Sequence, residues 1–570
     1  MNKFYFNEEQ DSYDAIVVGT GISGGWAAKE LCEQGLKTLV LERGRMVEHI
    51  TDYKTANLDT WDFPNGGKLT KEDKAKQLKQ IRTGRVNNAD ANHWFVNDLE
   101  HPYKETKPFD WVRGYHVGGR SIMWGRHSYR WSEIDFEANK KDGHGVDWPV
   151  RYKDIAPWYD KVETYIGVSG EKMNLPQLPD GQFLPMMEHN CVEQHFRDKV
   201  YENLDGRVVT AGRIAHITGD KPFEGRTKCQ FRNRCARGCP FGGYFSSNSS
   251  TLPAAERTGN LTLRPDSIVS EVIYDPNTKK ASGVKVIDRL TKEEFVFKAK
   301  VIFLCASSMA TASILLQSKS DRFPNGLGND SDQVGRNVMD HHLGTGASGK
   351  FDGFEDKYYK GRRPGGVYIP RFKNLGGKSN SKNYVRGFGF QGGASRKNWK
   401  DSIAEFSMGA QMKDELLKPG GWTMGIGGFG EILPYEDNRM TLDYNTLDGW
   451  GLPTVNFNAD IRDNELKMRE DIIVNAAEML EKAGFRDVKA RDGGYNMGHG
   501  IHEMGTARMG RDPKTSVVNG HNQIHAVQNV YVTDGAFMAS SSCVNPSLTY
   551  MAFTARAANH AAQELKKGNI

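Results

Sequence analysis

The stretch Ala15-Ile-Val-Val-Gly19-Thr-Gly21-Ile-Ser-Gly24-Gly25-Trp-Ala-Ala28 decides the fold of this chain of 570 residues. Its β-branched apolar run predicts a buried strand, which leads into Gly-x-Gly-x-x-Gly and a helix-forming stretch to about Gln34. Gly19 permits a tight turn, Gly21 lets the backbone approach a pyrophosphate, and Gly24 lets the helix pack on the strand. The phosphates would bind the free N–H groups at the start of the helix. The stretch therefore predicts a dinucleotide-binding site.

A second predicted strand, residues 37–42, ends on an acid, Glu42, about 20 residues beyond the glycine motif. A carboxylate at this point can bind the ribose hydroxyls of an adenine dinucleotide. Further buried strands are predicted at 298–306 and 529–535, so the parts of the nucleotide-binding domain lie far apart in the sequence. We expect an α/β fold in which a Rossmann-like domain is interleaved with an α+β substrate domain built on an antiparallel sheet.

The expected division of the chain is discontinuous. Residues 351–460 are rich in glycine and aromatic residues with strand-like runs, which indicates a curved antiparallel sheet along one wall of a substrate cavity, and 463–484 have the spacing of an amphipathic helix. The nucleotide-binding domain is assigned to 1–50, 110–130, 225–345 and 490–570. The substrate domain is assigned to 131–224 and 346–489, and the polar segment 51–109 to an excursion or lid.

Composition excludes several classes of protein. The net charge is only +5, from 76 basic and 71 acidic residues, which argues against a nucleic-acid partner. No apolar run approaches the roughly 18–20 residues that a membrane-spanning helix needs. Residues 1–9 have neither the basic nor the apolar region of a signal peptide, which by itself indicates the cytoplasm. Seven cysteines, an odd number, do not suggest a disulfide framework.

Further motifs give the sequence a specific resemblance. They are Tyr115-His-Val-Gly-Gly-Arg-Ser-Ile-Met-Trp-Gly125, Val334-Gly-Arg-Asn-Val-Met-Asp-His-His342, Gly500-Ile-His-Glu-Met-Gly-Thr-Ala-Arg-Met-Gly510 and Val544-Asn-Pro-Ser-Leu-Thr549. With the N-terminal motif, they resemble the glucose–methanol–choline (GMC) oxidoreductases over essentially the whole chain. The resemblance implies bound FAD, oxidation of an alcohol to a carbonyl, and a substrate domain like that of p-hydroxybenzoate hydroxylase.

The resemblance also implies which residues bind FAD. These are Gly19, Gly21, Ile22, Ser23, Gly24, Glu42, Arg43, Gly118, Gly119, Ser121, Met123, Trp124, Val269, Asp534, Gly535, Asn545, Pro546 and Thr549. Some pyranose oxidases of the family attach FAD covalently through a histidine in the Gly-Gly loop. Met123 stands at the matching position and His127 does not align with it. FAD is therefore expected to be bound non-covalently.

In this family a histidine and a histidine or asparagine face the reactive nitrogen of the flavin, and the matching residues are His502 and Asn545. Hydride leaves the substrate carbon only as the hydroxyl loses a proton, so a base is required within hydrogen-bond reach. An imidazole titrates near neutrality and suits that role, and an amide can hold the same oxygen. The alternatives are that His502 is a structural histidine or that nearby His499 takes its place.

A cysteine-rich loop carries the strongest metal signal. Cys229, Cys235 and Cys239 follow the pattern C-x5-C-x3-C-Pro, with three arginines between them. Zinc would need a fourth ligand, and none is evident, whereas thiolates followed by Pro and Gly resemble iron–sulfur ligation. The same spacing occurs in a bacterial branch of the family that contains a 3Fe-4S cluster, whose charge the arginines would offset. The alternative is a loop of free thiols.

The stretches 130–149 and 157–163 resemble the catalytic subunits of bacterial FAD-dependent glucoside 3-dehydrogenases and glucose dehydrogenases. This resemblance implies oxidation of a pyranoside at carbon 3, with electrons passed through the cluster to a cytochrome c. It also implies a small companion subunit with a twin-arginine signal, and hence a periplasmic location by co-export. The alternatives are a glucose 1-dehydrogenase, a pyranose oxidase using oxygen, a non-catalytic flavoprotein electron-transfer subunit, and a nicotinamide-dependent enzyme.

Overall fold

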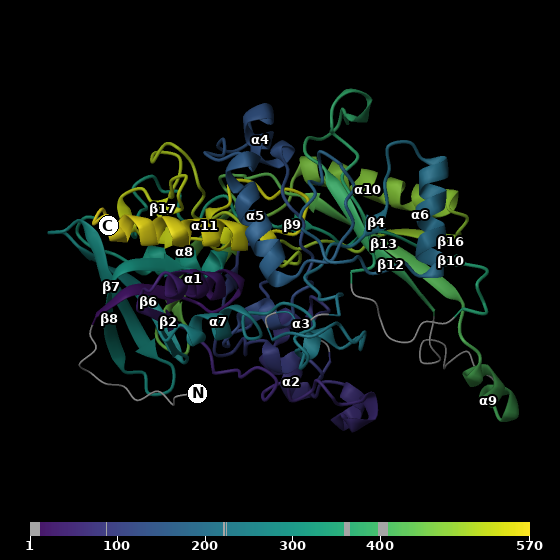
Figure 1. The fold of residues 1–570 in the computed structure, drawn as a ribbon, viewed down its shortest axis with the longest axis horizontal. Helices are drawn as coiled ribbons and strands as arrows, with labels where there is room; N and C mark the ends of the chain where they lie inside the picture. The colour runs from purple at the N-terminus through teal and green to yellow at the C-terminus, as the bar shows by residue number, and fades with distance from the viewer. Residues whose placement is uncertain (1–11, 87, 221–222, 224, 358–364, 397–407) are drawn as a thin grey trace.

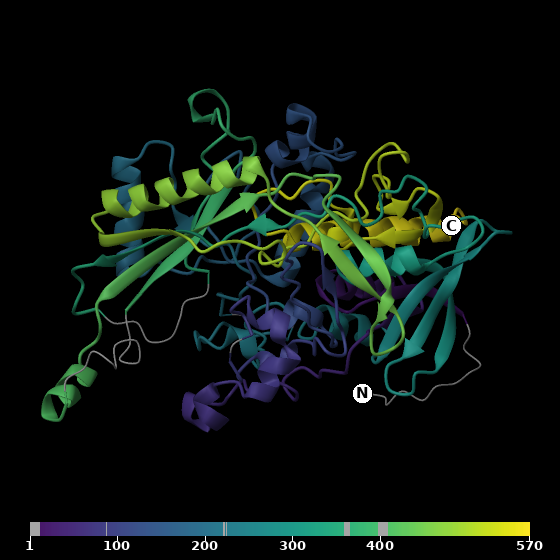
Figure 2. The same ribbon diagram turned by 180° about the vertical axis from the view of Figure 1, so that it is seen from behind.

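The computed structural model describes residues 12–86, 88–220, 223, 225–357, 365–396 and 408–570. Residues 1–9, on which the expected absence of a signal peptide rests, lie outside this part of the chain. Two large sheets occupy opposite ends of the molecule (Figure 1, Figure 2), and helix α5 (Tyr152–Ile166) lies between them. This arrangement confirms the predicted mixed α/β architecture with more than one sheet.

The first sheet is the nucleotide-binding one. Its strands follow the order β17-β18-β8-β1-β2-β5, and β6 pairs with β7, which pairs with β8. The bounds are β1 Ser12–Val18, β2 Thr38–Leu41, β5 Leu261–Arg264, β6 Ser267–Asp275, β7 Lys280–Asp288, β8 Glu294–Leu304, β17 Gln523–Ile524 and β18 Val527–Val532. β1, β2, β5, β8 and β18 pair in parallel, which buries their apolar runs on both faces.

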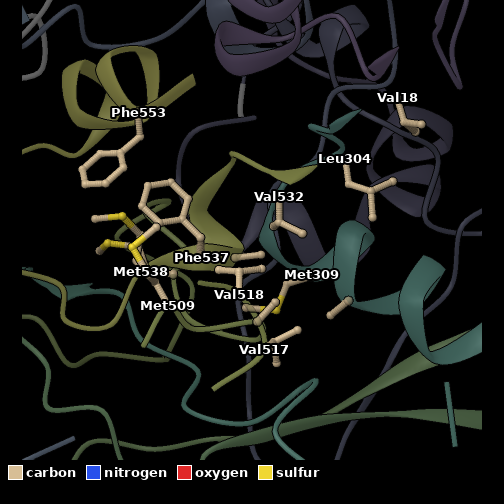
Figure 3. Close-up of a cluster of buried hydrophobic side chains, with 14 of the residues drawn as sticks. Val18, Leu304, Met309, Met509, Val517, Val518, Val532, Phe537, Met538 and Phe553 are labelled. Carbon is tan, nitrogen blue, oxygen red and sulfur yellow. The ribbon is translucent and has the colours of Figure 1, made fainter. Parts of the chain in front are cut away.

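Helices cover this sheet and close its core. They are α1 Ile22–Glu33, α7 Thr251–Arg257, α8 Ser308–Gln317 and α11 Ser547–Lys566. Figure 3 shows the core where Val18, Leu304 and Val532, which end β1, β8 and β18, lie near Met309 of α8. Phe537 and Phe553 extend the same cluster, with ring centroids 4.8 Å apart. The carboxyl ends of the parallel strands therefore rest on a closely packed apolar cluster.

The second sheet is antiparallel, in the order β16-β10-β13-β12-β11-β4, with β9 paired to β13. Its strands are β4 Thr210–Ala211, β9 His341–His342, β10 Thr345–Phe351, β11 Val367–Ile369, β12 Phe388–Arg396, β13 Trp422–Glu431 and β16 Arg486–Asp492. Helix α10 (Asp463–Lys482), which corresponds to the helix predicted over 463–484, lies along one face (Figure 2). α6 (Cys191–Asn203) joins α10 and the sheet in one buried apolar cluster.

The remaining elements are small. A three-stranded sheet combines β14 (Arg439–Leu447), β15 (Pro453–Asn458) and β3 (Lys104–Glu105). The other helices are α2 Lys71–Lys76, α3 Leu78–Ile81, α4 Glu133–Asp142 and α9 Ala410–Leu417. Within the described residues, no helix has the length and apolar character needed to cross a bilayer.

Two contacts cross the expected division of the chain. α5 belongs to the segment assigned to the substrate domain, but it packs on α11, and its Tyr159 hydroxyl lies 2.7 Å from the Thr549 hydroxyl. The turn between β14 and β15 was also assigned to the substrate domain, yet Asp448 in that turn forms an ion pair with Arg43 of the nucleotide-binding domain at 2.6 Å. Both contacts include long-range polar pairs that local periodicity does not reveal.

Candidate active site

One cavity of about 650 Å³ extends from the ends of β1 and β2 to the two predicted catalytic side chains. Most of the predicted site residues line it. They are Gly19, Gly21, Ile22, Ser23, Glu42, Arg43, Gly119, Ser121, Met123, Trp124, Val269, Asp534, Gly535, His502 and Asn545. The cavity is built from segments that range from Val18 to Tyr550 in the chain, so only the complete fold brings them together.

Four predicted FAD-binding residues lie outside the cavity lining. Gly24 is the point where α1 meets β1, because a Cβ there would lie 1.9 Å from the Gly19 carbonyl oxygen. Gly118 has a φ of +90°, and a Cβ there would overlap the side chain of Asn248. Pro546 immediately precedes α11, and Thr549 is buried against Tyr159. Gly24 and Gly118 allow the close backbone packing beside the cavity, and the Thr549 hydroxyl is bonded to Tyr159 of α5.

The nucleotide end of the cavity fits a dinucleotide. A Cβ at Gly21 would have no heavy atom within 4 Å, so a ligand can approach the backbone at this residue. Gly21 is also the N-cap of α1, and no side chain caps this end of the helix. The first N–H groups of a helix have no intrahelical partner and favour an anion such as pyrophosphate. Tyr550 also lines the cavity, and its buried hydroxyl has no partner among the described residues. A bound cofactor would supply such a partner.

Glu42 occupies the position expected for a ribose ligand. Its carboxylate accepts the Thr20 N–H at 3.2 Å and the Gly44 N–H at 3.0 Å. Burial raises the pKa of Glu42, and these donors oppose that shift. The Thr20 hydroxyl also donates to this carboxylate, so about one of its roughly four acceptor sites remains for a ribose hydroxyl.

At the other end of the cavity, His502 and Asn545 lie side by side. His502 Nε2 and Asn545 Nδ2 are 3.4 Å apart. Gln391 of β12 donates its Nε2 hydrogen to Asn545 Oδ1 at 2.5 Å, which directs the amide nitrogen of Asn545 toward His502. This is where the antiparallel sheet reaches the site, although the cavity lining takes no residue from β10–β13. The competing histidine, His499, is instead held by Asp110, with Nδ1 3.2 Å from Oδ2.

A second histidine determines which nitrogen of His502 carries its proton. His341 Nε2 lies 3.0 Å from the Ser541 carbonyl and 2.9 Å from the Ser542 carbonyl, so it carries hydrogen. Burial lowers the pKa of His341 to about 4, so the ring is neutral and its Nδ1 is an acceptor. His502 Nδ1 lies 2.8 Å from that atom and must donate to it. His502 Nε2 is thereby left as an acceptor at the cavity wall, 3.4 Å from Asn545 Nδ2.

The backbone around His502 is also fixed. The buried carboxylate of Asp340 accepts the His502 N–H at 3.0 Å, the Gly500 N–H at 2.8 Å and the Tyr495 hydroxyl at 2.8 Å. Burial holds the pKa of His502 well below its usual range, with further contributions from His341 and from nearby cations. His502 is therefore a neutral base near pH 7, in a fixed tautomer.

Sequence reasoning gave no role to Asp340 and His341, although they belong to a quoted motif. The signal that was present is the Asp-His-His run at 340–342, where three titratable residues follow Val338 and Met339, and the two histidines form β9. Gln391 and Asp448, in contrast, lie in segments without a motif. Only the tertiary structure identifies them.

Replacing His341 with Phe is expected to lower kcat by on the order of 10² or more, because His502 would lose the acceptor that fixes its tautomer. FAD content should stay the same, as His341 does not line the cavity. Stopped-flow flavin reduction measures the effect. His342→Leu is the matched control: this neighbouring buried histidine has no partner for either ring nitrogen among the described residues. Equal losses in both variants would show a general packing effect instead.

The three cysteines Cys229, Cys235 and Cys239 line one small pocket. The Gly243 N–H donates to Cys239 Sγ at 3.3 Å. Burial raises the pKa of Cys229 to about 11, and the two neighbouring thiols add to the shift. Throughout the described residues, no group of three or more His, Cys, Asp or Glu side chains converges to hold a single metal ion.

The arginines of the cysteine loop do not have the surroundings expected of them. Arg232 donates to the Ala56 carbonyl at 2.7 Å, Arg234 forms an ion pair with Asp59, and Arg237 forms one with Asp90 at 3.1 Å. Carbonyls and carboxylates of the excursion thus compensate these charges. The arginines fasten the excursion to the cysteine loop.

The cysteine loop also borders the main cavity. Ala236, which directly follows Cys235, is part of the cavity lining. The Tyr244 hydroxyl donates to the Ile122 carbonyl and lies 3.0 Å from the Cys235 carbonyl, so it joins the cysteine loop to the Gly118–Trp124 segment. A single layer of protein separates the two sites.

The cavity combines a dinucleotide-binding end with a neutral histidine base. This combination is typical of dinucleotide-dependent oxidoreductases, which remove a proton and a hydride from an alcohol. Family models described as GMC oxidoreductase match residues 13–343 and 434–554. The chain belongs to the GMC oxidoreductases, flavoenzymes that act on CH–OH groups with FAD as cofactor. The sequence-based assignment of family, fold and enzyme class is confirmed.

Named relatives agree with this assignment. The chain is 25% identical to the fructose dehydrogenase large subunit of Gluconobacter japonicus, over 99% of this chain and all of that protein. It is 26% identical to the 2-methyl-1,2-propanediol dehydrogenase of Mycolicibacterium austroafricanum, over 96% of this chain and 95% of that one. The formate oxidase structure from Aspergillus oryzae matches with a TM-score of 0.59 at 15% identity, covering 98% of this chain and 99% of that one.

Proposed function

We propose that this chain is the catalytic subunit of a pyranoside 3-dehydrogenase, which oxidises a glycoside hydroxyl to a ketone and delivers the electrons singly to a cytochrome c. The observation that carries the proposal is that His502 Nε2 and Asn545 Nδ2 face the same cavity that begins at the glycine motif. A sugar dehydrogenase and a diol dehydrogenase among the relatives support the substrate class. Oxidation at carbon 3 is supported by the resemblance of residues 130–149 and by the cysteine spacing.

His502 and Asn545 would both contact the substrate oxygen, His502 as the base and Asn545 as a hydrogen-bond donor. The glycine motif and Glu42 would hold FAD, which would supply the acceptor for the hydride of the substrate carbon. His502 Nε2 takes the hydroxyl proton, and the C–O single bond becomes C=O as the C–H and O–H bonds break. Asn545 Nδ2 donates to the same oxygen and holds the carbon in position. His341 and Asp340 keep the ring and backbone of His502 in the required orientation.

The cysteine loop is the proposed site of a 3Fe-4S cluster, which would supply one-electron transfer. Three thiols around one pocket, with a backbone N–H directed at Cys239, fit a cluster better than a single ion, because each thiolate of a cluster binds a different iron. Phe231 and Phe241 of this loop are each 41% exposed and offer a contact surface for a partner. The proposed partners are a cytochrome c and a small twin-arginine companion subunit, which would co-export the chain to the periplasm.

The proposed reaction is tested by an anaerobic spectrum of the holoenzyme before and after addition of methyl glucoside or lactose. Bleaching of the flavin, followed by identification of a 3-keto product by NMR, is the expected result. A lactone product would indicate a glucose 1-dehydrogenase, and rapid reoxidation by oxygen a pyranose oxidase. A flavin that no sugar reduces would favour a non-catalytic electron-transfer subunit.

Cys235→Ser is expected to remove iron from the purified protein and to reduce cytochrome c turnover at least tenfold, because a hydroxyl is a poor ligand for a cluster iron. Flavin reduction by sugar should stay within a few-fold of wild type. Iron content, low-temperature EPR and cytochrome c reduction are the measurements. Cys191→Ser, a half-buried cysteine outside the loop, is the control. Absence of iron from anaerobically purified wild-type protein would overturn the cluster assignment.

A further inference from the structure

Five arginines of the described chain line the main cavity, and they differ in how their charge is compensated. Arg43 pairs with Asp448 at 2.6 Å, Arg113 with Asp98 at 2.9 Å, and Arg120 with Glu503 at 2.8 Å. Arg85 and Arg126 have no carboxylate within 4.0 Å among the described residues. These two arginines are therefore the ones whose charge a ligand could use.

Arg126 is directed toward the cysteine loop. Its guanidinium donates to the Trp124 carbonyl, its Nε lies 3.2 Å from His216 Nε2, and the group lies 5.1 Å from the centre of the Tyr244 ring. His216 and Tyr244 both line the small pocket that holds the three thiols. Arg126 thus belongs to the wall between the two sites.

Arg85 lies at the catalytic end of the cavity. Its Nη2 donates to the His499 carbonyl at 3.2 Å, three residues before His502 in the chain. It is close enough to His502 for its charge to lower the pKa of that imidazole. The other guanidinium N–H groups have no partner among the described residues, and the side chain is accessible to the cavity. An arginine offers five donors in a planar fork, so most of its binding capacity is unused.

The surroundings of Arg85 explain why the protein does not neutralise it. Glu503 is already paired with Arg120, and the carboxylate of Asp340 is buried beneath three donors. The planar guanidinium of Arg85, close to the base His502, suits a carboxylate, which it can bind through two parallel hydrogen bonds. We propose that Arg85 binds a carboxylate of the substrate, so that the physiological substrate is an acidic sugar whose carboxylate lies near the oxidised CH–OH group. This inference rests on the proposed function and narrows its substrate class.

The test compares two glycosides that differ at one carbon, methyl glucoside and methyl glucuronide, as reductants of the holoenzyme flavin. Wild type is expected to show a kcat/KM at least tenfold higher for the glucuronide. In Arg85→Gln this preference should disappear, through a 10- to 100-fold loss on the glucuronide and a change of less than about threefold on the glucoside. Arg85→Lys should keep part of the preference. Arg126→Gln, the other uncompensated cavity arginine, should keep all of it.

Several outcomes would overturn the inference. One is a wild-type preference for the neutral glucoside. Another is an equal loss on both sugars in Arg85→Gln, which would show that Arg85 acts on the charge of the reaction itself. A higher rate with methyl glucoside 6-phosphate than with the glucuronide would assign the site to a phosphate instead. If neither glycoside reduces the wild-type flavin, the proposed reaction fails. Glucuronate binding, followed by the flavin difference spectrum in wild type and Arg85→Gln, then decides the role of Arg85 separately.

Discussion

His502→Ala is expected to bind FAD as well as wild type and to lose on the order of 10²–10⁴ in the rate of flavin reduction by substrate. The reason is that Nε2 is the neutral acceptor for the hydroxyl proton, fixed in this tautomer by the 2.8 Å contact with His341. Anaerobic stopped-flow measurement of the reductive half-reaction isolates this step from electron delivery. Added imidazole should restore part of the rate, since it replaces the missing base within the same cavity.

The pH profile gives an independent check on His502. A base works only when unprotonated, and burial together with His341 and Arg85 places the pKa of His502 below 6.5. The wild-type rate of flavin reduction should therefore stay level from neutral pH to about pH 6, and fall below it as the buried Asp340 carboxyl, whose pKa is raised to about 6, and then the His502 ring become protonated. His499→Ala is the matched control, because this histidine pairs with Asp110. Near-normal turnover in His502→Ala would end the assignment.

Gly24→Val is expected to prevent formation of a stable holoenzyme, with FAD content below about a tenth of wild type. A Cβ at residue 24 would lie 1.9 Å from the Gly19 carbonyl oxygen, so α1 would have to move away from β1. Overpacking of this kind typically costs about 1–3 kcal/mol and more where only backbone can yield. The ratio of flavin to protein absorbance and the thermal unfolding temperature measure the two consequences.

Gly21→Ala separates cofactor binding from folding. A Cβ at this position would meet no heavy atom within 4 Å, and the φ of Gly21 is −66°, which any residue adopts. The apoprotein should therefore unfold at the same temperature as wild-type apoprotein, while FAD affinity falls at least tenfold, since a methyl group would occupy the approach of the pyrophosphate. Unchanged FAD affinity would show that the pyrophosphate lies elsewhere.

Local sequence was enough to predict the parts of the site that are built from contiguous motifs. Gly19, Gly21 and Glu42 could be placed because a strand, a glycine turn and a helix form one unit within about 30 residues. His502 and Asn545 could be placed because each lies inside a motif that resembles those of the family. The second strand followed from its apolar run, and helix α10 from helical spacing alone.

The other parts of the site depend on contacts that sequence patterns do not encode. Arg85 lies in a polar segment without periodicity, and it reaches the catalytic end only because the excursion folds over the cavity. Gln391 contacts Asn545 across 154 residues of chain. The three arginines of the cysteine loop, which were expected to offset the charge of a cluster, bond to carboxylates and carbonyls of the excursion. Such pairings are decided by tertiary geometry.

The strand order of the first sheet has a consequence for how the protein is made. β8 pairs with β1 on one side and with β18 on the other, and α11 packs against α1. A nascent chain that has not yet released β18 would present the apolar edge of β8, residues 301–304, which is a template for aggregation. The cavity for FAD therefore gains its last lining residues, Asn545, Ser547 and Tyr550, only near the end of synthesis, and FAD bound after that point would stabilise the folded chain by mass action.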